Sequence, residues 1–142
     1  QYEYDVFVSY SAEDGNWVWD QLAPRLEGED NLKLCVHERD FAAGRLIIDN
    51  IVESIEDSRH ALIVVSNNFA RSDWCQFEMT LAQKHVLNEL MEPLVIVLLE
   101  DIKIEYMSKT LKALLSTTTY LTWNEDPEVA AIFWEKLRRS LR

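Results

Sequence analysis

The sequence has few of the residues and motifs that mark several common enzyme and secreted classes. Its three glycines form neither GxGxxG nor GxxxxGK[ST], which argues against a dinucleotide-binding fingerprint and a P-loop. No GxSxG occurs, so the nucleophile elbow of the α/β-hydrolases is missing. The two cysteines form no CxxC, and no Asn-x-Ser/Thr signal is present. This cysteine usage is typical of a reducing cytosolic setting.

Positive charge is also scarce. The chain has 14 Lys and Arg against 25 Asp and Glu, a formal net charge of −11. That balance argues against nucleic acid and anionic lipid as partners, because both require a basic surface. The three histidines are scattered without partners at ligand spacing, so we expect no metal site.

The 142 residues have the length of one ordinary domain. No linker, repeat or low-complexity tract interrupts them, so we expect a single domain over residues 1–142. The longest apolar run, residues 94–99, is too short to span a bilayer. The chain begins with Gln1 and its first Met is Met79. We therefore expect a piece of a larger protein, with any membrane segment outside it.

Apolar runs and helical periodicities alternate along the chain. The expected strands are residues 4–10, 32–37, 61–66, 93–99 and 119–123. The expected helices are residues 14–28, 46–57, 72–90, 103–116 and 127–141. Pro24 should kink or loosen the first helix. "NNFARSDW" is predicted to be a turn into the third helix, with Ser72 or Asp73 as its N-cap.

Five strand–helix units predict an α/β fold with right-handed crossovers. The expected architecture is a flavodoxin-like doubly wound parallel sheet of order 2-1-3-4-5, with helices on both faces and a crevice at the ends of strands one and three. "YSAEDG" and "SNNF" occupy those ends. A phospho-accepting receiver domain shares this topology, and Glu13 and Asp14 would supply its acidic pair. However, strand three closes at Ser66 and strand five at Trp123, where a receiver requires Asp and Lys.

Three stretches on this frame resemble the boxes of a Toll/interleukin-1 receptor (TIR) domain, most closely the cytoplasmic domain of a Toll-like receptor. "YDVFVSY" is similar to the first box, "RDFAAG" to the second and "FW", Phe133-Trp134, to the third. "KLCVHERDF", "IIDNIVESI" and "SDWCQFE" are similar to receptor-type members. The resemblance covers residues 4–141, nearly the whole chain.

This resemblance implies an innate-immune signalling module on the cytosolic side of a single-pass membrane receptor. Its partners would be other TIR domains, in the receptor itself or in adaptor proteins. The main association surface would be the BB loop that follows strand two. The expected contact residues are Arg39, Asp40, Phe41, Ala43, Gly44 and Arg45.

Alternative interpretations of these residues stay open. Phe41 has the character of an interface side chain rimmed by charge, or it folds back onto the sheet edge. Arg39 and Asp40 are contact residues, or they form a local ion pair of little energetic value. The first box and Phe133-Trp134 are predicted to be core rather than contact.

One residue departs from the family pattern. The second box usually has Pro just before its Gly, and Ala43 stands at that position. Proline would restrict φ and reduce the conformational entropy of the unbound loop. We therefore expect a larger ordering cost when this loop binds a partner.

Some TIR domains hydrolyse NAD with a Glu on the third helix, and Glu78 in "WCQFE" stands at the matching position. Under this alternative, NAD is a substrate, no bound cofactor is needed, and the carboxylate stabilises the charge that develops on the ribose. Tyr10, Ser11 and Trp74 would line the crevice. The other interpretation is that Glu78 is an ordinary helix-surface or capping carboxylate.

Overall fold

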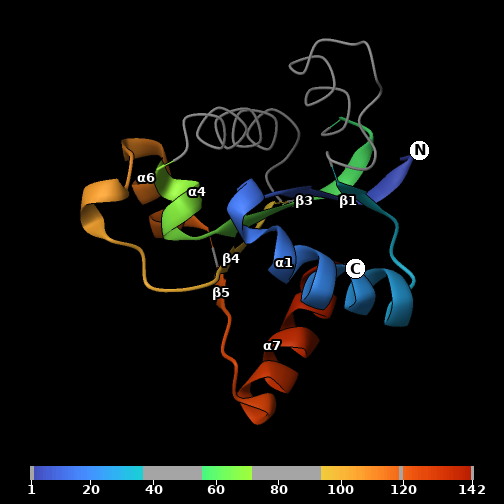
Figure 1. The fold of residues 1–142 in the computed structure, drawn as a ribbon. Helices are drawn as coiled ribbons and strands as arrows, with labels where there is room; N and C mark the ends of the chain where they lie inside the picture. Colours follow the sequence, from blue (N-terminus) through green and yellow to red (C-terminus); the bar gives the residue numbers. More distant parts are fainter. Residues whose placement is uncertain (1, 37–55, 72–93, 119, 142) are drawn as a thin grey trace.

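The computed structural model describes residues 2–36, 56–71, 94–118 and 120–141. Five parallel strands form one sheet of order β2-β1-β3-β4-β5, which confirms the predicted topology (Figure 1). The strands are β1 (Tyr4–Ser9), β2 (Leu34–Val36), β3 (Ser58–Val65), β4 (Leu94–Leu98) and β5 (Tyr120–Thr122). Each strand falls within or overlaps its predicted range. The ranges were predictable because strands of a sheet covered on both faces are typically continuous apolar runs.

The largest difference from the expected strands is at the start of β3. The strand begins at Ser58, three residues before the predicted Ala61, and Ser58 and His60 pair with Tyr4 and Val6 of β1. The first three residues, "SRH", are polar, so the sequence does not predict a strand there. They are in the strand because their backbone forms hydrogen bonds with β1.

Alternate strand residues face opposite sides of the sheet and form two apolar clusters. On β1, Val6 and Val8 belong to one cluster and Phe7 to the other. All three have 0% exposure, so the first box is core, as predicted.

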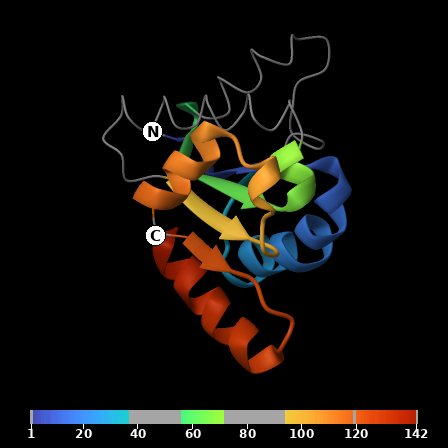
Figure 2. The same ribbon diagram turned by 90° about the vertical axis from the view of Figure 1, so that its left-hand side faces the viewer.

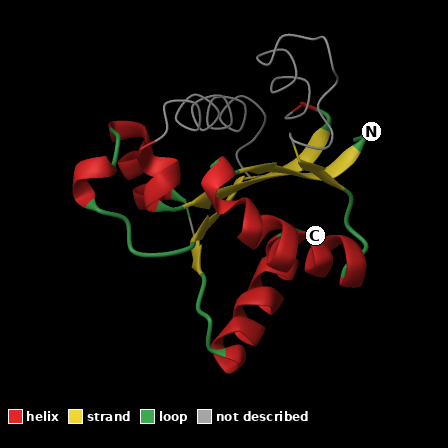
Figure 3. Ribbon diagram, in the orientation of Figure 1, coloured by secondary structure: helices red, strands yellow, loops and turns green. Residues whose placement is uncertain are grey.

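Helices cover both faces of the sheet (Figures 1 and 2). The helical segments α1 (Gly15–Trp17), η2 (Val18–Leu22) and η3 (Pro24–Glu29) pack with α7 (Pro127–Ser140) on one face. On the other face, α4 (Asn67–Arg71) and α6 (Lys109–Thr117) contribute to the second cluster. Figure 3 shows the same three layers by secondary structure.

The predicted helix 14–28 is present, but much of it is π-helical. After the 3₁₀ turn η1 (Ala12–Asp14) and α1, the amide of Ala23 donates to Val18 and that of Asp30 to Arg25, both i to i+5 bonds. Pro24 begins η3 and has no amide hydrogen to donate. Asn31 then has φ 56, a left-handed value that Asn tolerates.

Two helical predictions need correction. "NNFAR" was predicted to be part of a turn, but it forms the short helix α4. The predicted helix 103–116 is two elements, η4 (Ile104–Tyr106) and α6, separated by extended backbone at Met107 and Ser108. The Ser108 side chain accepts from the Leu111 amide at 3.0 Å, so Ser108 is the N-cap of α6.

The last predicted helix is confirmed as α7. Asp126 caps its N-terminus by accepting from the Glu128 amide at 2.9 Å, and Pro127 occupies the first turn. Arg138 and Arg139 lie in its last turn, where positive charge complements the helix dipole.

Candidate functional site

The candidate site lies where β1 and β3 end, next to each other in the sheet. The chain leaves β1 toward β2 on one side and leaves β3 toward β4 on the other. Such a topological switch point opens a crevice beyond the carboxyl ends of the strands. The segments after the two strands, η1 and α4, therefore carry the side chains that meet there.

Asp14 of η1 makes the central contact of this site. The Ser66 hydroxyl donates to Asp14 Oδ2, and Asn68 Nδ2 lies 3.5 Å from Asp14 Oδ1. Ser66 is 1% exposed, and its oxygen also accepts from the Phe69 amide at 3.0 Å. One serine thus joins the turn after β1 to the first turn of α4.

The surroundings of Asp14 disfavour its charged form. Burial raises the pKa of the Asp14 carboxyl above its ordinary value of 3.8. Hydrogen bonds from Ser66 and Asn68 act in the opposite direction, while the nearby charges of Glu100 and Glu13 raise the pKa further. The net effect is a carboxyl that takes up a proton more readily in the folded chain than in the unfolded one.

Asp14→Asn is therefore expected to change how stability depends on pH. Because the folded pKa is raised, the stabilisation from Asp14 is complete below 3.8 and is lost as pH rises through the folded pKa. As the pH falls from about 7 to about 4, the free energy of unfolding of the parent chain should increase relative to that of Asp14→Asn. Urea unfolding of both chains at several pH values measures this.

The control for that measurement is Asp20→Asn, which removes an exposed carboxylate from the same helical run. It separates the effect of losing a carboxylate in general from the effect of losing Asp14. A difference between the parent and Asp14→Asn that is constant with pH, or that moves the opposite way, would show that hydrogen bonding outweighs burial at Asp14.

A second set of hydrogen bonds attaches the segment after β4 to the start of α4. The Asn67 amide and its Nδ2 donate to Glu100 Oε2 at 2.9 and 3.1 Å, and Nδ2 also donates to the Asp101 carbonyl at 3.1 Å. The Lys103 amide donates to Asn67 Oδ1 at 2.8 Å. Asn67 therefore fixes the loop beyond β4 next to the crevice.

Two cations lie against one aromatic ring beside this loop. The guanidinium carbon of Arg71 is 5.2 Å from the Tyr106 ring centroid, and Lys103 Nζ is 5.6 Å from it. Arg71 also donates to Asn68 Oδ1. Cation–π contacts of this kind add modest stability at exposed sites, so α4 and η4 support each other.

Two of the predicted site residues are described by the structure, and both are buried. Tyr10 is 1% exposed and packs in the core cluster that includes Val18 and Leu22. Ser11 is 7% exposed, and its hydroxyl accepts from the Glu13 amide at 3.4 Å as the N-cap of η1. These placements give both residues roles in the fold at the edge of the crevice.

The remaining predicted site residues lie outside the described part of the chain. They are Arg39, Asp40, Phe41, Ala43, Gly44 and Arg45 of the expected BB loop, and Trp74 and Glu78 of the NAD alternative. The predicted caps Ser72 and Asp73 fall in the same category.

The third box is buried core, as predicted, and it is part of an aromatic cluster. Phe133 and Trp134 are 4% and 7% exposed. The Trp17 ring is stacked on Trp134 with centroids 6.1 Å apart, and Trp123 lies edge-on to Trp134 at 5.5 Å. The box therefore fixes α7 against the helical run after β1.

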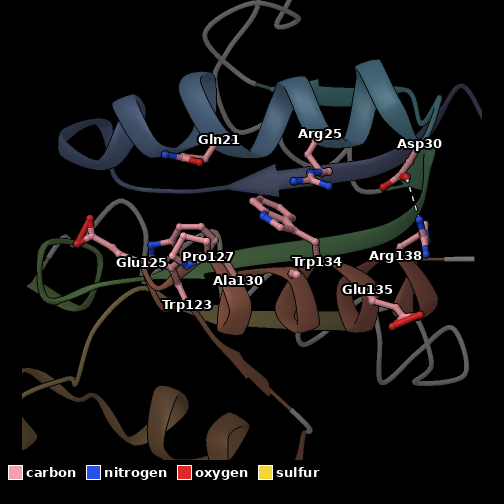
Figure 4. Close-up of a pocket in the computed structure, with 11 residues that line it drawn as sticks. Gln21, Arg25, Asp30, Trp123, Glu125, Pro127, Ala130, Trp134, Glu135 and Arg138 are labelled. Atoms are coloured by element: carbon pink, nitrogen blue, oxygen red, sulfur yellow. Dashed lines mark ion pairs between the residues drawn. The ribbon is translucent and has the colours of Figure 1, made fainter.

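An open pocket of about 410 Å³ lies beside this cluster, between η2–η3 and α7 (Figure 4). Its two arginines already have partners. Arg138 Nη1 lies 3.8 Å from Asp30 Oδ1, and Arg25 Nη1 lies 3.3 Å from Glu29 Oε1. The Arg25 guanidinium also lies over the Trp134 ring. With these charges paired, the pocket is a weaker candidate than the switch point.

Sequence reasoning located the crevice but missed the residues that connect its parts. "YSAEDG" and "SNNF" do meet, yet the roles of Ser66, Asn67 and Glu100 were not predicted. The signal for Ser66 is a polar residue directly after a buried strand, since it follows β3. Asn67 and Glu100 are each the second residue after a buried strand, β3 and β4. Within residues 2–36, 56–71, 94–118 and 120–141, no three His, Cys, Asp or Glu side chains are grouped to hold a metal ion. No helix in those same ranges has the length and apolar character to cross a membrane.

Comparison with known proteins identifies the family. The family model described as "TIR domain" matches residues 3–141. The chain is 39% identical over 143 residues to Toll-like receptor 2 of Mus musculus, and 37% identical over 142 residues to Toll-like receptor 6 of Bos taurus. Each alignment covers 98% of this chain and 18% of the receptor, so the chain spans less than a fifth of those relatives.

A solved structure agrees in fold. The TIR domain of the Toll-related receptor TRR-2 from Hydra magnipapillata superposes with a TM-score of 0.79 at 29% identity, covering 98% of both chains. A TIR-STING receptor from C. gigas superposes with a TM-score of 0.70 at 24% identity, covering 99% of this chain and 40% of that receptor. At this identity the similarity supports the fold alone. The chain belongs to the TIR domain family.

Proposed function

We propose that this chain is the cytosolic signalling domain of a membrane receptor in innate immunity and that it acts by associating with other TIR domains. The observation that carries the proposal is the identity of 37–39% to Toll-like receptors 2 and 6 across 98% of the chain. Residues 1–142 form one TIR domain under this proposal. Its partners are TIR domains of receptors and of adaptor proteins.

The contact segment is the BB loop, residues 39–45, which contains the second box. The preceding strand β2 is at the edge of the sheet and ends at Val36. Segments that follow a strand on a rigid scaffold commonly carry binding residues. Aromatic side chains with a charged rim are frequent in the energetic centre of interfaces, and "ERDFAAGR" has this composition.

Phe41→Ala is expected to weaken association with partner TIR domains at least tenfold, since losing a buried aromatic side chain costs about 2 kcal/mol or more at an interface. Its melting temperature should stay close to that of the parent chain. Titration calorimetry against the purified TIR domains of the Toll-like receptor 2 and 6 relatives measures the affinity, and thermal unfolding measures the stability.

A matched control is Ile104→Ala, which removes an apolar side chain that is 75% exposed on η4. It should leave both affinity and melting temperature nearly unchanged. If Phe41→Ala unfolds the chain or binds like the parent, Phe41 is structural and the proposed contact segment is wrong.

We infer that the domain signals by association rather than by NAD hydrolysis. The relatives quoted above are receptors by name, and Tyr10 is buried in the core. Incubating concentrated protein with NAD, with Glu78→Ala as control, tests the inference. Nicotinamide release that disappears in Glu78→Ala would overturn it.

A further inference from the structure

The outer surface of α7 carries exposed apolar side chains. Its inner face is buried through Ala130, Phe133, Trp134 and Leu137. Facing away from them, Ile132 is 57% exposed and Val129 is 42% exposed. Among the described residues, only three other large apolar side chains, Tyr2, Ile104 and Tyr120, are exposed to this degree. The start of α7 also projects beyond the rest of the described molecule (Figures 1 and 2).

Charge is unevenly distributed along the same helix, although Glu135 lies in its C-terminal half. The N-terminal end carries Glu125, Asp126 and Glu128, while the C-terminal end carries Lys136, Arg138 and Arg139. Arg138 is paired with Asp30 and Arg139 with Glu135. In the described part of the chain, the side chains of Glu128 and Lys136 have no ion-pair partner.

Glu128, Ile132 and Lys136 are four residues apart, so they form one row on the helix surface. The row is acidic, apolar and basic in order, and each charge lies about 6 Å along the axis from Ile132. A second α7 placed antiparallel across a twofold axis at Ile132 brings each Glu128 opposite the partner's Lys136. A parallel arrangement would instead place like charges together.

We propose that this row, residues 128, 132 and 136 of α7, is a self-association surface whose occupant is the same row of a second copy of this chain. The two Ile132 side chains meet at the centre, and two Glu128–Lys136 ion pairs flank them. Val129 adds apolar contact at the side. This surface does not include residues 39–45, and it adds a second contact to the proposed association.

The helix dipole alone accounts for acidic residues at one end of α7 and basic residues at the other. It does not account for two exposed apolar side chains between them. The two explanations also differ in what charge reversal does. If the charges serve only the helix dipole, reversing both should lower the stability of the helix more than reversing one. If they form the self-association surface, reversing both should restore the self-association that a single reversal weakens.

The test compares Glu128→Lys, Lys136→Glu and the double variant by sedimentation velocity at low salt. Concentrations should reach about 1 mM, because interfaces below about 1,200 Å² are weak. Each single variant should weaken self-association roughly tenfold or more, since like charges then face each other twice. The double variant should return to within about threefold of the parent chain.

Phe41→Ala separates this inference from the proposed function. If α7 supplies the contact, self-association and its response to charge reversal should persist in the Phe41→Ala chain. Absence of self-association up to that concentration would overturn the inference. So would single reversals without effect, or a double variant as weak as the singles, because the face would then suit a different partner or none.

Discussion

Phe133→Ala is expected to lower the free energy of unfolding by about 3–5 kcal/mol. The Phe133 side chain is 4% exposed. Its ring centroid lies 5.0 Å from that of Trp134, 5.3 Å from Trp123 and 6.4 Å from Trp17, all edge-to-face. Removing it leaves a cavity among three large rings that cannot close, and it also removes aromatic pair energies of about 0.5–1.5 kcal/mol each.

The neighbouring residue provides the control. Ile132→Ala removes a side chain of similar apolar character at the adjacent position, but Ile132 is 57% exposed. Its cost should stay within about 0.5 kcal/mol. Urea unfolding followed by far-UV circular dichroism at low protein concentration compares the two, because fluorescence would report directly on the tryptophans that surround Phe133.

This comparison decides between core and contact for the third box. A loss below about 1 kcal/mol for Phe133→Ala would contradict the packing described here and would favour a contact role. Under the core interpretation, Phe133→Ala that is still folded should associate with partner TIR domains as the parent does. Any loss of binding should track the unfolded fraction.

The strands could be predicted from the sequence because their signal is local. β1, β3 and β4 are nearly continuous apolar runs, and burial on both faces of a parallel sheet demands this pattern. Alternation of these runs with helical periodicity then limits the topology to a few possibilities. The start of β3 at Ser58 was missed because its evidence is pairing with Tyr4, 54 positions earlier, not its own composition.

The starts and breaks of the helices were harder to predict than the strands, because they depend on contacts with residues distant in the sequence. "NNFAR" was predicted to be a turn, and the contacts around its helix reach Glu100 and Asp14, which are 33 and 54 positions away from Asn67 and Asn68. The break before α6 did have a local signal, namely Ser108 three residues before Leu111. An apolar periodicity from Ile104 to Leu114 concealed that signal.

The candidate site was predicted only in outline. Topology placed the crevice at the ends of strands one and three, and the contact between Asp14 and Ser66 lies there. The sequence could not show which polar atoms would pair, because hydrogen bonds between loops depend on the relative position of whole elements. Glu13 and Asp14 were considered an acidic pair, whereas Asp14 alone bonds to Ser66 and Asn68.

Ser66→Ala is expected to destabilise the chain by about 1–3 kcal/mol. The Ser66 hydroxyl is buried, donates to Asp14 and accepts from the Phe69 amide at 3.0 Å. Alanine fits the same space but leaves a buried amide and a partly buried carboxylate without that partner. Ser116→Ala is the matched control, because Ser116 is exposed and its hydroxyl donates to the Lys112 carbonyl within α6. Its change should stay within about 0.5 kcal/mol.

A double variant tests whether the bond between Ser66 and Asp14 joins the two segments. Because Ser66→Ala and Asp14→Ala each remove the same hydrogen bond, the double variant should cost less than the sum of the two single changes by about 1 kcal/mol. Urea unfolding at neutral pH gives all four free energies. Costs that add within about 0.5 kcal/mol would mean that this bond contributes no coupling. The attachment of α4 to the turn after β1 would then depend on packing around Phe69, which is fully buried beside Val65 and Ile63 in the second apolar cluster.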